Sequence, residues 1–315
     1  MKASASAAAT LMTLVLGCSS PEQPTSRSPT LLDEPLSELP AKLSAVGVYP
    51  RLPALELASR AQAYEPQYPL WSDGGDKQRS LVLPEGESID DSDPSAYVFP
   101  VGTLIFKTFS FRTPNSPDTA VPVETRLLRL NDDGWQLAAY AWDDTVKDAA
   151  LLDLKRSQTR EILNDDDAVV EHSIPSRLEC RQCHESALSE VLGINALQKT
   201  KLAGHGPLTT EVLGYLVGNC IHCHNGSNGA ASSFDLRPDD ALQNLIDRPT
   251  ESSATADGIR VVPGKPEESV MFLGVQGSND SEVKEMPPLG VALRDAGAVT
   301  MLKDWITALA SEQDP

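Results

Sequence analysis

The stretch RLLRLNDDGWQLAAY, residues 126–140, is typical of a β-hairpin. Apolar and β-branched or aromatic residues flank a turn at Asp132-Asp133-Gly134, and turns of this composition commonly join two antiparallel strands. Segments of similar composition, separated by turn residues, lie at 80–84, 97–111 and 123–130. We therefore expect residues 46–175 to form a β-rich domain, either an antiparallel sandwich or a partial barrel.

The pattern changes after residue 175. Residues 209–219 carry apolar side chains at helical spacing, and Thr209 or Thr210 is available as the N-cap. A second helix is predicted over 295–312, where one face collects Val299, Leu302, Trp305, Ile306 and Leu309. Both helices are short and need tertiary packing for their stability.

The chain is strongly acidic, with a formal net charge of -19 over 315 residues. Such a charge repels nucleic acid and anionic membrane surfaces, so neither is an expected partner. The charge is explained either by solubility or by steering toward a partner protein with a basic surface.

The N-terminus is typical of an export signal. Lys2 is followed by an apolar run at 11–16 and then by VLGC, which resembles a bacterial lipoprotein box. We expect cleavage after residue 17 and lipid attachment at Cys18; the alternative is an ordinary signal peptide with a stray cysteine. Residues 18–45 are rich in Ser and Pro and are predicted to be a flexible tether. The protein should then be lipid-anchored, on the periplasmic side of a bacterial membrane or at the cell surface.

Two C-x-x-C-H motifs dominate the second half of the chain. CRQCH spans residues 180–184 and CIHCH spans 220–224. This spacing is the attachment signature of c-type haem, in which two thiols form thioethers with one porphyrin and the histidine binds iron. The predicted sites are Cys180, Cys183 and His184 for one haem, and Cys220, Cys223 and His224 for the other.

Two other sites could use the same cysteines. The four thiolates could bind one zinc ion, or each pair could be a redox-active dithiol of thioredoxin type. Both alternatives leave His184 and His224 without a role, so we favour two haems. His222, between the second pair of cysteines, is predicted to be a solvent-side spacer.

The distal iron ligands are less sharply indicated. Met286 lies in KEMPPLG, where two prolines can hold its sulfur rigidly, and it is predicted to be the sixth ligand of the second haem. The order of helix, motif, long loop, Met-Pro and terminal helix is that of a class I cytochrome c. For the first haem the candidates are His205, which we prefer, His172 and Met271, or the sixth position is open. Met271 is more typical of core packing, and Met301 is the weakest candidate.

These patterns together predict an α+β multidomain fold. A β-rich, sandwich-like N-terminal domain should be followed over 176–315 by a mainly α-helical, class I-like cytochrome c region with two haems. The segment WSDGGDKQR, residues 71–79, could form a partner or ligand site, or bind a cation, through Asp73, Asp76, Lys77 and Arg79. We favour the simpler interpretation, a turn with a buried ion pair that closes the β-domain.

Several segments together resemble a family of exported bacterial dihaem c-type cytochromes with a β-rich N-terminal region. They are PQYPLWSDGGDKQRSLVLPEGESID, FPVGTLIFKTFSF, VETRLLRL, IPSRLECRQCHES and LGYLVGNCIHCHN, within residues 40–315. The resemblance implies covalent haem at both motifs, with His184 and His224 on iron. The segments VVPGKPEESVMF and MPPLG are similar to the later part of many bacterial cytochrome c domains, where the Met-Pro methionine is the distal ligand.

Three functional hypotheses follow. The first is a membrane-anchored carrier that passes electrons between redox partner proteins. The second is a dihaem oxidoreductase, peroxidase-like, whose first haem keeps an open position for substrate. The third is a binding module in which the β-domain recognises a partner and the haems are secondary.

Overall fold

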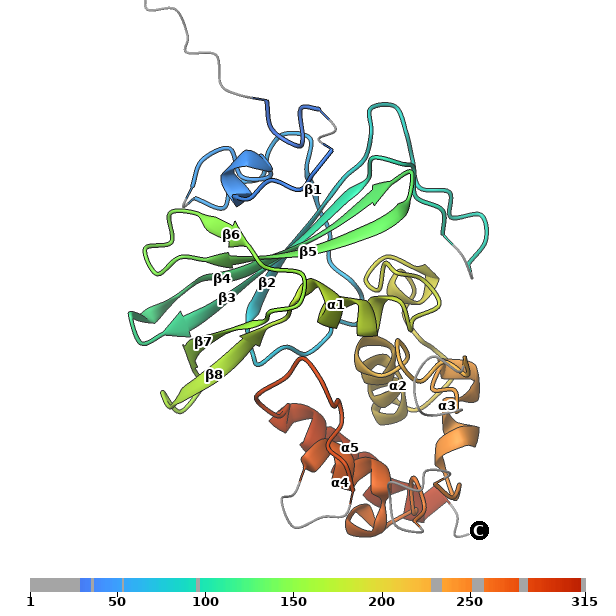
Figure 1. Cartoon of the computed structure of the whole chain (residues 1–315). Coiled ribbons are helices and arrows are strands. Elements are labelled where there is room, and N and C mark those ends of the chain that lie inside the picture. Colours follow the sequence, from blue (N-terminus) through green and yellow to red (C-terminus); the bar gives the residue numbers. More distant parts are fainter. Residues whose placement is uncertain are drawn as a thin grey trace, which may run out of the picture.

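The computed structural model describes residues 29–312, apart from residues 35–36, 53, 95–96, 228–233, 251–257 and 278–282. The predicted signal peptide and Cys18 lie outside the described residues. A large sheet forms one part of the molecule and helices α2 to α5 gather beside it (Figure 1).

The main sheet has six antiparallel strands in the order β1-β2-β3-β4-β5-β6. The strands are β1 (Gln62–Ala63), β2 (Asp76–Val82), β3 (Leu104–Thr113), β4 (Ser116–Asn131), β5 (Gly134–Trp142) and β6 (Ala149–Leu151). The predicted hairpin is confirmed, since β4 and β5 pair up to Asn131 opposite Gly134. A separate antiparallel ribbon is made by β7 (Gln158–Leu163) and β8 (Val169–Ile174).

One face of the main sheet is covered by the N-terminal segment. Phe106 of β3, Leu127 of β4 and Trp142 of β5 are buried in one cluster with Leu31 and Leu43. Leu43 belongs to a short 3-10 helix, η1 (Leu43–Ala45). The folded body therefore includes residues from about 30 onward, whereas the tether was expected to extend to residue 45.

The opposite face, here called the motif face, carries the alternate residues of the same strands. At one end Ile105, Leu128 and Leu137 pack against Cys180 and Val191. At the other end the sheet packs against the β7–β8 ribbon, in a cluster that holds Phe109, Ala139, Ile162 and Ile174. The period of two along each strand thus produces two separately covered faces.

Five helices occupy the rest of the described chain. They are α1 (Arg177–His184), α2 (Pro207–Asn219), α3 (Pro238–Leu245), α4 (Val270–Gln276) and α5 (Ala296–Glu312), with 3-10 turns η2 (Ala196–Gln198) and η3 (Pro266–Glu268). The two predicted helices are confirmed as α2 and α5, and Leu302, Trp305 and Ile306 are buried as expected. The N-cap of α2 is Gly206 followed by Pro207, not a threonine.

The predicted fold class is wrong in two respects. The β-domain is one six-stranded sheet with a two-stranded ribbon rather than two comparable sheets, because the N-terminal segment, not a second sheet, covers its other face. The region 176–315 is not a mainly α-helical, class I-like domain, and the chain as a whole is β-rich. Turn-forming residues keep most of residues 185–206, 220–227 and 234–237 outside regular helices.

Among the described residues no helix combines the length and apolar character that a membrane crossing requires.

Candidate functional site

The first C-x-x-C-H motif lies on helix α1. Ser176 ends the extended segment that follows β8 and caps the helix: its hydroxyl accepts from the Glu179 amide (3.3 Å), and its own amide donates to the Glu179 carboxylate (2.7 Å). This capping box fixes the start of α1. Positions i, i+3 and i+4 of a helix share one side, so Cys180, Cys183 and His184 face the same way.

A hydrogen bond to a backbone carbonyl fixes the orientation of the His184 ring. Its Nδ1 lies 2.5 Å from the Glu190 carbonyl oxygen, so Nδ1–H donates and Nε2 keeps its lone pair. A histidine that binds a metal through one ring nitrogen usually donates the other N–H in this way. Burial lowers the pKa of His184 to about 4. The ring is therefore neutral at pH 7, which is the form that binds metals.

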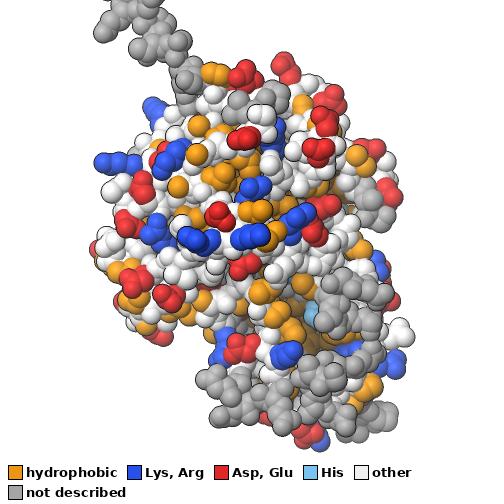
Figure 2. All heavy atoms as spheres, in the orientation of Figure 1, with side chains coloured by type: hydrophobic (Ala, Val, Ile, Leu, Met, Phe, Trp, Pro, Cys, Tyr) orange, Lys and Arg blue, Asp and Glu red, His pale blue; other side chains and the backbone are white. Residues whose placement is uncertain are grey.

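A cavity of about 320 Å³ opens in front of this motif. Its lining includes Cys180, Cys183 and His184, together with apolar side chains of the motif face and of residues 191–193. Residues 287–291, which follow Met286, close another side. Volumes of this order are usual for sites that hold small molecules. Figure 2 shows one face of the molecule, on which hydrophobic, basic and acidic side chains are interspersed.

The second motif lies where helix α2 ends. Cys220 is the C-cap residue, and the amides of Cys223 and His224 both donate to its carbonyl oxygen, at 3.0 and 2.9 Å. Cys220 packs against the core of the helices, and burial raises the pKa of its thiol to about 12. The ring of His224 lies 4.6 Å from that of Phe234. Burial, with smaller effects of His222 and Arg260, lowers the pKa of His224 to about 4.

The two motifs meet in space. The Cys183 side chain lies near those of Cys223 and His222, and both neighbours lower the pKa of its thiol. The proximity of Cys183, together with burial, raises the pKa of Cys223. His222 is half-buried and also lines the cavity, and its role as a spacer stays a prediction. In the part of the chain that the structure describes, no three or more His, Cys, Asp or Glu side chains are grouped to hold a metal ion. The four cysteines thus do not converge as the zinc alternative requires.

One candidate sixth ligand has a different role. His172 is 1% exposed, and both ring nitrogens are engaged, Nδ1 with Asp73 Oδ2 at 2.8 Å and Nε2 with Glu124 Oε1 at 3.3 Å. Neither nitrogen is available for iron, so the prediction of His172 as a ligand is wrong.

The remaining candidate ligands are His205, Met271 and Met286. His205 is exposed and precedes α2, whereas Cys220 follows the far end of that helix. Met271 packs against the helical core, as expected. Met286 is 40% exposed, and its amide donates to the Gly274 carbonyl oxygen at 3.0 Å. Among the described contacts none joins His205 or Met286 to either motif, so both stay predictions as ligands.

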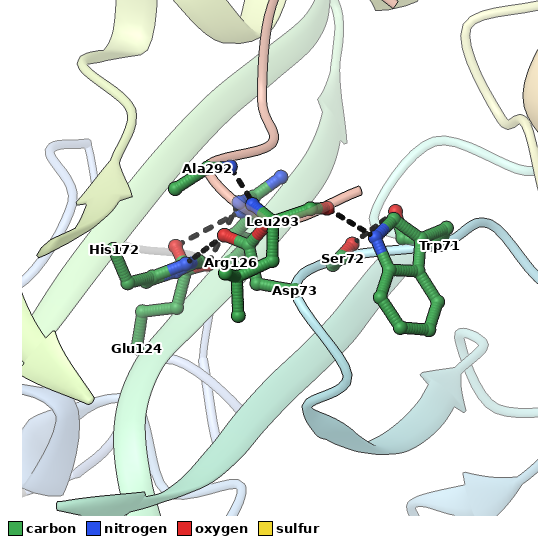
Figure 3. A network of polar contacts seen from close by, with 8 residues as sticks. All are labelled: Trp71, Ser72, Asp73, Glu124, Arg126, His172, Ala292 and Leu293. Atoms are coloured by element: carbon green, nitrogen blue, oxygen red, sulfur yellow. Dashed lines mark hydrogen bonds and ion pairs between the residues drawn. The ribbon is translucent and has the colours of Figure 1, made fainter. Parts of the chain in front are cut away.

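The buried turn predicted at 71–79 is confirmed, and it reaches further than expected. Asp73, with φ of 51°, accepts the backbone amides of Ala292 (2.7 Å) and Leu293 (2.8 Å) on Oδ1 and binds His172 on Oδ2. Trp71 Nε1 donates to the Leu293 carbonyl oxygen at 2.8 Å. Figure 3 shows this network joining β4, β8 and the segment before α5. Asp73 thereby ties the loop that closes the cavity to the sheet.

The charges in this network stabilise one another. Burial alone would lower the pKa of His172, but its hydrogen bonds to Asp73 and Glu124 raise it overall. Burial would raise the pKa of Glu124, yet Arg126 and His172 lower it overall. Glu124 accepts Arg126 Nη2 at 2.7 Å and Nε at 3.0 Å. Within the turn, Arg79 pairs with Glu65 at 2.6 Å, while Asp76 lies exposed.

Sequence reasoning named Arg79 as a candidate but missed the two cations beside it on the motif face. Arg79 of β2, Lys107 of β3 and Arg126 of β4 line the cavity beside the first motif. Burial and the neighbouring Arg126 and Arg79 lower the pKa of Lys107 to about 7. A lysine within the apolar strand LIFKTFSF is the signal that could have pointed to this group.

Comparison with family models, with curated proteins and with solved structures finds no match to this chain.

Proposed function

We propose that this chain is an exported c-type cytochrome that binds two covalent haems and carries electrons between redox partner proteins. The observation that carries the proposal is the arrangement of the first motif. Cys180, Cys183 and His184 share one side of α1 and line one cavity, and the Glu190 carbonyl leaves His184 Nε2 free to bind iron. A redox-active dithiol of thioredoxin type needs no metal-binding histidine beside its cysteines.

The second motif would hold the other haem through Cys220, Cys223 and His224. When bound, the haems would supply one-electron chemistry at their irons. The proximity of Cys183 and Cys223 makes the two attachment sites neighbours, which suits electron exchange within one chain. The net charge of -19 favours a partner with a basic surface.

A second candidate function is a dihaem oxidoreductase of peroxidase type with an open first haem. One observation favours it: the described residues that line the cavity include no methionine, and the histidines among them are His184 and His222. Cyanide separates the candidates. An open site binds it at neutral pH and changes the ferric spectrum, whereas a carrier with two six-coordinate irons leaves the spectrum unchanged.

The test of the proposal uses paired variants of the full chain, produced with the machinery that attaches c-type haem. Cys180→Ala/Cys183→Ala and Cys220→Ala/Cys223→Ala should each lose one haem mass and keep the other. His184→Ala should keep its thioether-bound haem but lose the low-spin spectrum of that site. Unchanged haem content in either double variant would refute the assignment of that motif.

A further inference from the structure

Three basic side chains lie in one row across neighbouring strands of the motif face. Arg79 of β2 stands opposite Lys107 of β3, and Lys107 stands opposite Arg126 of β4. Side chains directly opposite each other in antiparallel strands have Cβ atoms about 4.5–5.5 Å apart, and like charges there are destabilising. A row of this kind is therefore a cost to folding unless something neutralises it.

The protein neutralises the row only in part. Arg79 pairs with Glu65 and Arg126 pairs with Glu124. Among the described residues no carboxylate forms an ion pair with Lys107. Its amine lies 5.4 Å from the centroid of the Phe109 ring, which also has the Arg126 guanidinium at 4.5 Å and the Lys77 amine at 5.9 Å. The chain has 45 acidic residues and 26 basic ones, so a largely buried cluster of basic side chains with too few acidic partners is unexpected.

The row faces the cavity of the first motif. Arg79, Lys107 and Arg126 line that cavity together with Cys180 and His184. Its lining also includes apolar side chains such as Ile105, Leu128 and Val191, and polar ones such as Glu179 and Gln198. Lys107 and His184 both line this cavity. A ligand that matches this cavity would have a broad apolar body, for the apolar side chains, and carboxylates at one edge, for the basic row.

We propose that Lys107, flanked by Arg79 and Arg126, pairs with the propionate carboxylates of the haem that the first motif binds. The inference rests on the proposed function, because it needs haem at Cys180 and Cys183. Lys107 supplies a point charge, and the Arg126 guanidinium keeps donors beyond the two that Glu124 occupies. Lys107 is a positioning residue that also raises the reduction potential, since a nearby cation favours the ferrous form.

The experiment is a redox titration of the haem-loaded full chain carrying Lys107→Gln. We expect two one-electron components, of which one falls by about 59 mV, a tenfold change in its ferric-to-ferrous ratio, while the other stays in place. The shifted component should also gain a pH dependence near neutral pH, because its propionates have lost their cation. Lys107→Arg should keep the parent potential, and Lys155→Gln, at an exposed lysine, is the matched control.

A stability measurement separates pairing from packing. Lys107→Gln should leave the haem-free chain as stable as the parent or more stable, because it removes like-charge repulsion, yet it should destabilise the haem-loaded chain. Unchanged potentials in Lys107→Gln with both haems present would overturn this inference and leave the proposed function intact. Loss of the low-spin spectrum would also overturn it and would make Lys107 an iron ligand instead. A parent chain without haem at the first motif would overturn both.

Discussion

Replacing Asp73 by alanine should destabilise the protein by about 4 kcal/mol, because it breaks a buried charge network. The Asp73 carboxylate accepts two backbone amides, at 2.7 and 2.8 Å, and binds the buried His172 ring at 2.8 Å. Removing one partner of a buried charge pair typically costs about 3–5 kcal/mol, since the remaining group stays buried and unpaired. Without the Asp73 carboxylate the amides of Ala292 and Leu293 lose their acceptor. This loss should also loosen residues 287–291, which close one side of the cavity.

The assay is thermal unfolding of the full chain followed by circular dichroism. For a chain of this size about 4 kcal/mol corresponds to a fall of about 10 °C in Tm. Asp76→Ala is the matched control, because Asp76 belongs to the same segment but is exposed; its Tm should change by no more than about 1–2 °C. Hydrogen exchange should quicken at the amides of Ala292 and Leu293 in Asp73→Ala alone. Equal melting temperatures for the two variants would refute the structural role given to this network.

Three further predictions concern stability. Because the pKa of His172 is raised on folding, this residue stabilises the fold below about pH 6.5, and the contribution is lost as pH rises through the folded-state pKa. Because the pKa of Glu124 is lowered, this residue stabilises the fold above about pH 4.3, and the contribution is lost as pH falls. Urea midpoints should therefore be highest between these pH values, and His172→Gln should weaken the fall of the urea midpoint at alkaline pH. Gly218→Ala should cost about 1–3 kcal/mol, because an added Cβ would lie 2.8 Å from the carbonyl oxygens of residues 68 and 69, while Gly206→Ala, with open space around it, should cost much less in the same urea titration. Trp305→Ala should cost about 3–5 kcal/mol by calorimetry, since this side chain is 1% exposed in the helical core, and a cost below 1 kcal/mol would contradict that packing.

Local patterns predicted the elements that depend on local interactions. The hairpin at 126–140 and the helix ending at Glu312 follow from turn residues and from helical periodicity, and both are present. The burial of Leu31 and Leu43 could not be predicted in this way, because it depends on a sheet face formed much later in the chain. The same limit applies to the fold class: one sheet covered by an irregular segment and two packed sheets give similar strand patterns.

For the candidate site, too, local features could be predicted from the sequence and contacts between distant segments could not. The chemistry of Cys180, Cys183 and His184 could be proposed from spacing alone, but their meeting with Cys223 could not. His172 was a plausible ligand in the sequence, whereas the structure pairs it with Asp73 from a segment 99 residues away. The cationic row depends on the register of three strands, which places Arg79, Lys107 and Arg126 side by side. Pairing over such separations leaves little trace in a single sequence.

The most direct test of the central claim is to count covalent haems and bound metals on the same sample. The full chain, produced with the c-type maturation machinery, should show two added haem masses, two irons per chain and no zinc, with low-spin ferric and ferrous spectra. Motifs of this kind without attached haem, or zinc bound at the cysteines in place of iron, would contradict the account.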